Sequence, residues 1–294
     1  MQTAYRQLSM APNTYQTWGQ CLEFTLKTRD RWVHGNGRPT AIINTSHFTR
    51  HYGRGLRVDK IDQAFMDLYV HELEKEGKSA ATVNRCISAV STVLNHCHRR
   101  KLIAKPDSFE RKGESPPREF FYSVDNLGEM IKAANNIFRM PELGEIILFA
   151  VHTGMREGEI LRLATSDVNF AYNVIHVHKS KTAASTRTVP INSQIKPMLE
   201  RRLADAVDDR VFYEFDNKET LLRQLKKVTA YIGLDENYLF HTLRHTFCTI
   251  MAQNGVPLHE LAEVMGHNNI KTTLRYAKVS AEAKQAHIAA MPRI

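Results

Sequence analysis

Residues 79–101 read SAATVNRCISAVSTVLNHCHRRK and predict one long amphipathic helix. Their apolar positions recur at steps of three and four residues, which places them on one face of a helix. They are Val83, Ile87, Val90, Leu94 and Cys97. Ser79 is suited to cap the amino-terminal end of the helix. Further helical patterns in residues 14–33, 46–52 and 60–76 predict that the first part of the chain is a helical domain.

The opposite face of this helix is polar and carries no carboxylate. Its members are Arg85, Ser88, Thr92, Asn95 and Arg99. Residues 77–106 contain six basic residues and no acidic one, and residues 31–58, with Arg50 and Arg54, also lack an acid. Because a solvated helix usually mixes both signs of charge, we expect these side chains to contact DNA phosphates and to reach a groove. A basic face that serves solubility is the alternative.

Composition supports a polyanionic partner. The chain has 294 residues with 40 Lys and Arg against 31 Asp and Glu, and its pI is about 9.4. Such a surplus favours nucleic acid as the partner. No apolar run approaches the roughly 20 residues that span a bilayer, and residues 1–10 lack an apolar signal core. We therefore expect a cytoplasmic protein, associated with the nucleoid of a bacterial host and not with a membrane.

The four cysteines form no closely spaced pair. They are Cys21, Cys86, Cys97 and Cys248, and each has apolar neighbours in a helical pattern. We expect reduced, buried thiols, which exclude disulfide and thiolate-zinc architectures.

A boundary is predicted at residues 105–119, KPDSFERKGESPPRE, where proline, glycine and alternating charges interrupt the helical patterns. We expect a helical DNA-binding domain in residues 1–108, a linker in 109–119 and a second domain in 120–294. Residues 1–115 contain 18 basic and 11 acidic residues, a net charge of +7, whereas the remainder has 22 and 20, a net charge of +2. The basic surplus thus lies mainly in the first domain.

The second domain is predicted to be mostly α-helical with a small β-sheet. Alternating residues in 174–178 and 186–191 indicate a hairpin among several helical patterns. In TGMREGEI, residues 153–160, Arg156 can offer its planar fork to a phosphate, and Glu159 can hold that guanidinium. Taken alone, this pair also fits an ordinary surface ion pair. In HKSKT, residues 178–182, Lys179 can contact DNA, and Lys181 can donate a proton to a departing alkoxide.

Three further motifs follow toward the carboxyl end. In HTLRHTF, residues 241–247, His241 and Arg244 lie one helical turn apart, which suits an anionic transition state. His241 and His245 also have the spacing of a metal pair, but the metalloprotease motif needs Glu where this chain has Thr242. LAEVMGH ends at His267, and TTLRYA contains Tyr276, whose basic neighbours favour a phenolate. A half-buried tyrosine with a satisfied hydroxyl is the alternative for Tyr276 alone.

Together these motifs resemble those of the tyrosine recombinases, the family of phage integrases. The matching pieces are TGMREGEI, the lysine of HKSKT followed by TRTVPI, HTLRHTF, LAEVMGH and TTLRYA, and the resemblance covers essentially residues 12–280. It implies a core-binding helical domain followed by a catalytic domain. It also implies that Tyr276 attacks a DNA phosphodiester and forms a 3′-phosphotyrosyl link with a free 5′-hydroxyl.

The resemblance further assigns roles to the neighbouring residues. Arg156 and Arg244 would clamp the non-bridging oxygens, Lys181 would protonate the leaving 5′-oxygen, and Glu159 would support the first arginine. His241 would serve in proton transfer and His267 in hydrogen bonding to the phosphate. The ester conserves the energy of the broken bond, so no cofactor and no metal is expected, and no acidic cluster suited to a two-metal nuclease surrounds the motifs.

By the same resemblance, the protein would act on duplex DNA with paired core sites, as a homotetramer that exchanges its carboxyl-terminal tails. Integration or excision of phage or mobile-element DNA, with accessory DNA-bending proteins as possible partners, is the expected role. The first predicted helix begins near residue 14, so a further amino-terminal arm-binding domain is not expected. A type IB topoisomerase-like enzyme and a catalytically idle architectural DNA-binding protein are the alternatives.

Overall fold

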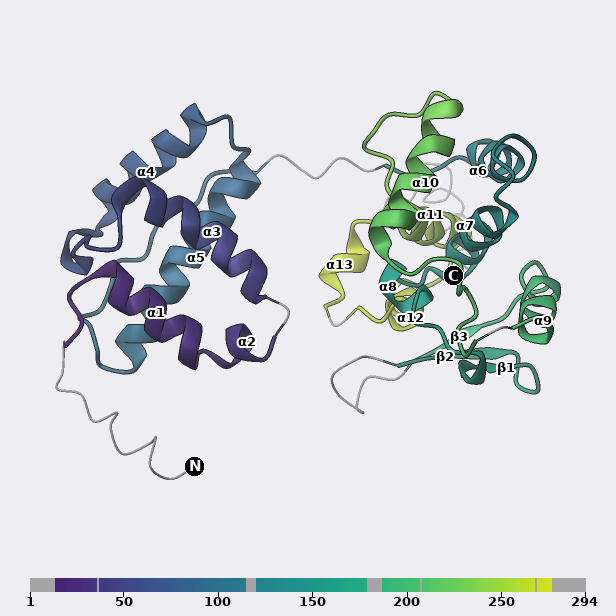
Figure 1. The fold of residues 1–294 in the computed structure, drawn as a ribbon, viewed down its shortest axis with the longest axis horizontal. Helices are drawn as coiled ribbons and strands as arrows, with labels where there is room; N and C mark the ends of the chain where they lie inside the picture. The colour runs from purple at the N-terminus through teal and green to yellow at the C-terminus, as the bar shows by residue number, and fades with distance from the viewer. Residues whose placement is uncertain are drawn as a thin grey trace, which may run out of the picture. The chain divides into compact units, whose positions relative to one another are not determined.

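The computed structural model describes residues 14–35, 37–114, 120–178, 187–206, 208–267 and 269–276 (Figure 1). These residues form two compact units, one in 14–114 and one in 120–276. The expected domain limits, with a linker at 109–119, stay a prediction because residues 115–119 lie outside the described ranges.

The regular elements that the structure describes in the first unit are all helices, joined by loops. Its elements are α1 (Trp18–Thr28), α2 (Asp30–Val33), α3 (Arg38–Tyr52), the 3₁₀ turn η1 (Val58–Lys60), α4 (Gln63–Lys75) and α5 (Ala80–Arg99). Its core contains Trp18, Phe48 and Tyr69, all fully buried, and the Trp18 ring packs edge-on against Phe48 at 4.7 Å between centroids. The Trp18 indole donates a hydrogen bond to Thr49 Oγ1 at 2.8 Å, which satisfies its buried polar atom.

Helix α5 follows its prediction closely. Ser79 caps it through Oγ, which accepts from the Thr82 amide at 3.4 Å, and the five residues of the predicted apolar stripe are buried. The structure corrects two other boundaries. The helix expected in residues 14–33 is interrupted at Arg29, whose backbone is extended, and α3 begins at Arg38, eight residues before the expected start. Pro39 occupies the first turn of α3, where its missing N–H has no intrahelical partner to lose.

The second unit combines helices with a small sheet. Its elements are α6 (Val124–Lys132), the π-helical turn η2 (Ala133–Ile137), α7 (Pro141–Thr153), α8 (Glu157–Ile160), the 3₁₀ turn η3 (Thr165–Asp167), β1 (Val168–Asn169), β2 (Val174–Val177), β3 (Arg187–Pro190), α9 (Lys196–Ala204), α10 (Lys218–Tyr231), α11 (Phe240–Gln253), α12 (Leu258–Met265) and α13 (Lys271–Leu274). This is the expected mostly helical fold with a small sheet.

The sheet is antiparallel in the order β1-β2-β3. The predicted hairpin is present, with Ile175 opposite Val189 and Val177 opposite Arg187, while β1 was not predicted. Figure 1 shows the sheet at one edge of this unit, with α12 next to β3. The hairpin therefore places Arg187 next to the end of α12.

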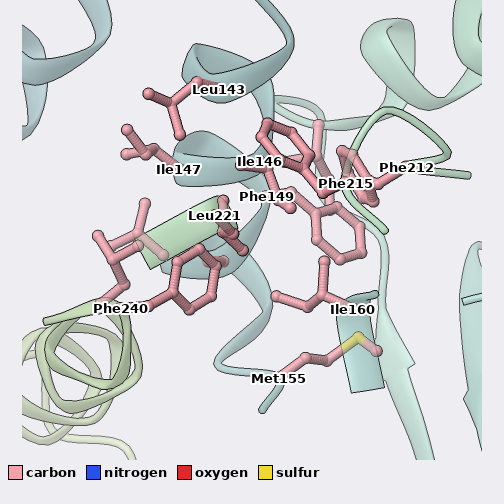
Figure 2. Close-up of a cluster of buried hydrophobic side chains, with 14 of the residues drawn as sticks. Leu143, Ile146, Ile147, Phe149, Met155, Ile160, Phe212, Phe215, Leu221 and Phe240 are labelled. Atoms are coloured by element: carbon pink, nitrogen blue, oxygen red, sulfur yellow. The ribbon is translucent and has the colours of Figure 1, made fainter. Parts of the chain in front are cut away.

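Helix α7 lies at the centre of the second core. Leu143, Ile146, Ile147 and Phe149 are fully buried on it, and Phe149 packs against Phe212 at 5.0 Å between ring centroids (Figure 2). The helix ends at Gly154, whose φ of +60° is left-handed. A Cβ at Gly154 would overlap the Phe247 ring and lie 2.8 Å from Met265 Sδ, so α11 and α12 approach this turn closely.

We expect Gly154→Ala to destabilise the second unit more than Gly255→Ala does. Both glycines end a helix with positive φ, so each substitution costs about 1–2 kcal/mol in backbone strain. Gly255 has open space at its Cβ position, whereas at Gly154 the methyl group also overpacks the interior, which adds about 1–3 kcal/mol.

The measurement is urea unfolding of the full chain followed by circular dichroism at 222 nm. Trp18 and Trp32 are the two tryptophans of the chain and both lie in the first unit, so the tryptophan fluorescence transition serves as an internal control and should not shift. Equal midpoints for the two variants would contradict the close approach at Gly154.

Candidate active site

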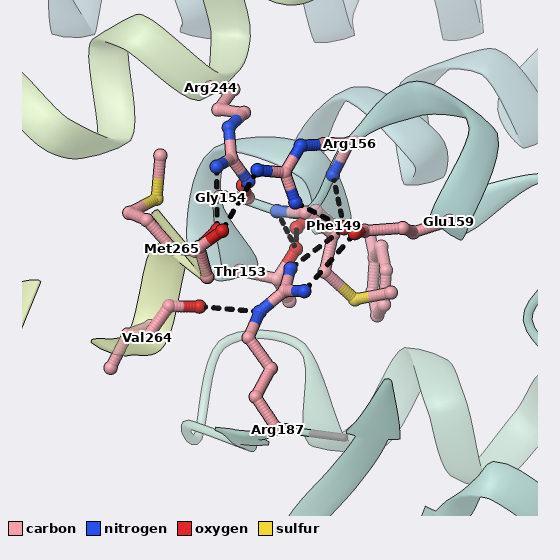
Figure 3. Close-up of polar contacts among 11 residues, drawn as sticks. Phe149, Thr153, Gly154, Arg156, Glu159, Arg187, Arg244, Val264 and Met265 are labelled. Atoms are coloured by element: carbon pink, nitrogen blue, oxygen red, sulfur yellow. Dashed lines mark hydrogen bonds and ion pairs between the residues drawn. The ribbon is translucent and has the colours of Figure 1, made fainter. Parts of the chain in front are cut away.

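The polar centre of the second unit forms at the carboxyl end of α12. The last carbonyls of any helix have no partner within it, and they carry the negative end of the helix dipole. Here three successive carbonyls, those of Val264, Met265 and Gly266, each accept from a different arginine (Figure 3). Gly266, with φ +61°, turns the chain at this point and ends the helix.

The three arginines come from distant parts of the sequence. Arg187 Nε donates to the Val264 carbonyl at 2.7 Å, Arg244 Nη2 to Met265 at 2.6 Å, and Arg156 Nη2 to Gly266 at 3.0 Å. Arg244 Nη1 also donates to the Gly154 carbonyl at 2.5 Å, which ties α11 to the turn after α7. Figure 3 shows the guanidinium groups of Arg156 and Arg244 next to each other.

A single carboxylate, Glu159, joins two of these arginines. Arg187 donates to both of its oxygens, at 3.1 and 2.7 Å, and Arg156 donates to it through Nη1 at 3.0 Å and through its main-chain amide at 2.8 Å. The Glu159 side chain is 8% exposed, and that of Arg187 is 9% exposed. Burial alone would raise the pKa of Glu159, but the hydrogen bonds from Arg187 and Arg156 outweigh it and lower the pKa to about 2.

The remaining charge is positive. Three guanidinium groups and one carboxylate leave an excess of two positive charges at the end of α12. Arg244 is 4% exposed, and burial together with Arg156 lowers its pKa to about 10, so it stays cationic at neutral pH. Cations that are fixed by neutral carbonyls form a site for an anion such as a phosphate.

Two histidines lie beside this cationic centre. His267 directly follows Gly266, and its Nδ1 lies 2.8 Å from the hydroxyl of the buried Thr273. Burial and the neighbouring arginines lower the pKa of His267 to about 4. His241, at the start of α11, is likewise lowered in pKa by the protein packed around it and by Arg244, so both imidazoles are neutral at pH 7.

Tyr276 lies near this cationic centre. It packs against a small apolar cluster that contains Phe247, Cys248 and Met265, and the carbonyl of this Met265 is the acceptor for Arg244. The Tyr276 hydroxyl forms a short hydrogen bond with His245 Nδ1. His245 follows Arg244 on α11. Burial raises the pKa of Tyr276, and the charge of Arg244 opposes this larger effect, so the phenol lies close to the cationic centre.

The structure thus brings together six of the residues singled out in the sequence, namely Arg156, Glu159, His241, Arg244, His267 and Tyr276. Lys179 and Lys181 lie outside the described residues, so their positions stay predictions. Arg187 and His245 were not predicted as members. Arg187 lies in the TRTVPI motif, but its partners are one main-chain carbonyl and one carboxylate, and such partners leave no sequence signal.

The described residues contain no group of three or more His, Cys, Asp or Glu side chains that could hold a metal ion. They also contain no helix long and apolar enough to cross a membrane. The four cysteines are free and buried, as predicted.

The predicted DNA-binding face of α5 lies at the surface of the first unit. Arg85, Asn95 and Arg99 are exposed, and Ser88 and Thr92 are partly buried, with their hydroxyls donating to main-chain carbonyls one turn earlier.

Arg50 and Arg54 lie in stretches without acids, yet each meets a carboxylate from elsewhere in the chain. Arg50 Nη2 lies 3.3 Å from Glu76, and Arg54 Nη2 lies 3.4 Å from Glu23. These are exposed ion pairs of small energetic value.

We expect Glu159→Gln to lower the free energy of unfolding by about 3 kcal/mol at pH 7, because the carboxylate pKa falls from the usual 4.5 to about 2 on folding. A carboxylate with a depressed pKa stabilises the protein above its unfolded pKa, and this contribution disappears as the pH falls through its folded pKa. The difference between wild type and variant should therefore shrink between about pH 4.5 and pH 2.

Chemical unfolding monitored by circular dichroism across this pH range checks the expectation. Glu200→Gln, an exposed position of α9, is the matched control and should show no such trend. A Glu159→Gln difference that is constant with pH would contradict the assigned ion-pair network.

Comparison with known proteins identifies the family. Residues 122–283 match the Phage integrase family. A protein described as tyrosine recombinase XerC-like from Caldanaerobacter subterraneus is 26% identical over 291 residues, covering 82% of this chain and 74% of that protein. Tyrosine recombinase XerA from Thermococcus onnurineus is 29% identical over 258 residues, with 83% and 86% covered.

Solved structures share the fold. The Tn1549 transposon integrase in complex with a circular intermediate DNA has a TM-score of 0.78 at 16% identity, covering 94% of this chain and 99% of that chain. A lambda integrase fragment, as a dimer bound to a COC′ core site, has a TM-score of 0.71 at 17% identity, with 95% and 99% covered. The chain belongs to the phage integrase family and is a site-specific tyrosine recombinase, an enzyme that breaks and rejoins DNA.

Proposed function

We propose that Tyr276 is the nucleophile of this recombinase and that Arg156 and Arg244 bind the phosphate it attacks. The observation that carries the proposal is the hydrogen bond between the Tyr276 hydroxyl and His245, the residue that directly follows Arg244 on α11. A phosphate that bridges the two arginines would then lie beside the phenol. Phosphoryl transfer between alcohols needs such positioning and charge neutralisation more than covalent help from the protein.

In the proposed reaction, the Tyr276 oxygen forms a bond to phosphorus while the bond to the 5′-oxygen breaks. The product is a 3′-phosphotyrosyl ester and a free 5′-hydroxyl, and Lys181 protonates the leaving oxygen. His241 takes part in proton transfer, and His267 donates a hydrogen bond to the phosphate. Glu159 and Arg187 hold Arg156 and do not react, which is consistent with their burial and mutual hydrogen bonds.

The proposed DNA contacts of the first unit involve α5 and α3. Arg85, Asn95 and Arg99 on the exposed face of α5 contact phosphates or base edges, and Ser88 and Thr92 contribute at close approach. Arg50 and Arg54 exchange their exposed carboxylate partners for phosphates, which costs little because such ion pairs are weak. Lys179 adds a contact from the second unit.

We expect Tyr276→Phe to abolish the covalent protein–DNA product, because phenylalanine has no oxygen to form the ester. The assay uses a pool of nicked duplex oligonucleotides of random sequence. Cleavage near the nick releases the short broken end, so the covalent product accumulates and is detected by denaturing electrophoresis. Sequencing the DNA that stays attached to the wild-type protein then defines its site.

Tyr172→Phe, at a tyrosine that is 79% exposed, is the matched control and should retain the product. A covalent band that persists with Tyr276→Phe would reassign the nucleophile. No covalent band with the wild-type protein would contradict the proposed function as a whole.

We extend the proposal to assembly. Two duplexes are joined when four copies of the chain meet on paired core sites, each lending its carboxyl-terminal segment to a neighbour. The second unit has a largely apolar groove of about 680 Å³ that can receive such a segment, lined by residues that include Val151, Phe247, Ile250, Val256 and Leu261. In the segment of residues 280–291, SAEAKQAHIAAM, Ile288 and Met291 are three positions apart and would share one face of a helix.

The proposed biological reaction is integration or excision of mobile DNA in the bacterial cytoplasm, with DNA-bending proteins as possible accessories. This role is supported by a protein of the same fold, which is described as the integrase of the transposon Tn1549.

We expect deletion of residues 280–294 and the groove substitution Val256→Asp to reduce assembly on DNA with two sites by tenfold or more, while binding to a single site changes little. Both changes remove the apolar contact between subunits, and each lost tenfold corresponds to about 1.4 kcal/mol. Electrophoretic mobility of one-site and two-site DNA measures the difference.

Ile137→Asp is the matched control, since Ile137 is 55% exposed and lies outside the groove. Assembly that is unchanged in the deletion variant would refute the exchange of this segment.

A further inference from the structure

The Tyr276 hydroxyl hydrogen bonds to a histidine to which the family motifs assign no role. His245 follows Arg244 on α11, and its Nδ1 is the atom that meets the hydroxyl. The His245 ring also packs edge-on against His241, with 4.6 Å between centroids and an interplanar angle of 85°. The imidazoles of His241 and His245, on one face of α11, therefore form a continuous contact between the cationic centre and the phenol oxygen.

The proposed nucleophile needs a proton acceptor. Burial raises the pKa of Tyr276 above its usual value, and the neighbouring Cys248 adds to this, although Arg275 and Arg244 act in the opposite direction. At neutral pH the side chain is therefore a phenol, which must lose its proton as its oxygen attacks phosphorus. A neutral imidazole with the proton on Nε2 accepts a hydrogen bond at Nδ1 and is suited to take that proton.

We propose that His245 is the general base of strand cleavage and the general acid of strand rejoining. The inference rests on the proposed role of Tyr276 as nucleophile. In cleavage, the proton moves from the Tyr276 oxygen to His245 Nδ1 as the oxygen–phosphorus bond forms and the bond to the 5′-oxygen breaks. The leaving oxygen takes its proton from a separate donor. In rejoining, the 5′-hydroxyl attacks phosphorus and His245 returns the proton to the departing tyrosine.

The other ionisable groups that face this pair are unsuited to the task. Arg244 and Arg275 are cations and cannot accept a proton at neutral pH. The Cys248 thiol is protonated, because burial raises its pKa to about 12. His267 Nδ1 is engaged with the Thr273 hydroxyl.

His241 contacts the His245 ring and not the hydroxyl, so it is placed to relay a proton from His245 onward. Arg156 faces His241, where its charge lowers the imidazole pKa. The positive neighbours of His241 favour release of a proton from this pair of rings once the phenol has been deprotonated; they are Arg244, Arg156, Arg275 and Lys218.

The test is the single-turnover rate of covalent adduct formation against pH, with His245→Asn and His245→Gln. Both amides can accept a hydrogen bond from the phenol but cannot take up a proton at neutral pH. The substrate is the nicked duplex recovered from the random pool, and rejoining is followed by adding a 5′-hydroxyl strand to the purified adduct. His259→Asn, at an exposed histidine of α12, is the matched control.

We expect both variants to cleave about 10²–10⁴-fold more slowly than wild type. In wild type, the rate of cleavage should rise with pH through the titration of an imidazole and the rate of rejoining should fall over the same range. Both slopes should be lost in the variants. A residue that only supports the fold would lower the two rates without removing their opposite dependence on pH.

The outcomes separate the two proposals. A wild-type rate and pH dependence in His245→Asn and His245→Gln, with Tyr276→Phe inactive, would overturn the role of His245 alone. Slow cleavage with the wild-type pH dependence would also overturn it. Circular dichroism and single-site DNA binding establish that each variant is folded before its rate is compared.

Discussion

The carboxyl end of α12 connects distant segments of the second unit. Three carbonyls there have no partner within the helix, and each accepts a hydrogen bond from an arginine of a different segment. Arg187 arrives from the sheet, Arg244 from α11, and Arg156 from the turn after α7. Gly266 turns the chain at this point with a left-handed backbone, and a Cβ in its place would lie only 3.0 Å from Arg187 Nη1 and crowd that side chain. The arrangement satisfies the helix end and fixes the cations with the same hydrogen bonds.

Fixing the cations before DNA arrives has an energetic consequence for the chemistry. An arginine side chain loses about 2 kcal/mol of rotamer freedom when it is immobilised. Here that loss occurs on folding. It therefore does not reduce the binding energy with which the arginines stabilise the pentavalent phosphorus of the transition state. Neutral carbonyls suit this purpose better than further carboxylates, because they orient a guanidinium without cancelling its charge. Glu159 cancels one charge, and Arg187 supplies a compensating one.

Much of this architecture could be predicted from the sequence, because its signals are local. The apolar stripe of α5 and its Ser79 cap are present as predicted, and the hairpin of β2 and β3 follows from alternating residues. The start of α3 was missed because glycine and proline around Arg38 are typical of a turn, although proline is also favoured in the first turn of a helix.

Within the site, the motifs indicated the residues whose chemistry is evident from their type and spacing. The roles of Arg187 and His245 in the site were not predicted, for a physical reason. The role of Arg187 depends on the Val264 carbonyl and on Glu159, which lie 77 and 28 residues away in the sequence. Separations of this size are not revealed by the periodicity of a helix or a strand. His245 was recognised as half of a metal pair, and its contact with Tyr276 exists through the packing of two helical segments. Tertiary contacts of this kind leave no pattern in one sequence.

The burial of all four thiols makes this protein a convenient scaffold for site-directed labelling. Each cysteine is completely shielded from solvent, two in α5 and one each in α1 and α11. A maleimide dye reacts with accessible thiolates, so a cysteine introduced at a surface position is modified ahead of the native ones. Dyes attached in each of the two units then report the distance between them on DNA by energy transfer, without removal of any natural cysteine.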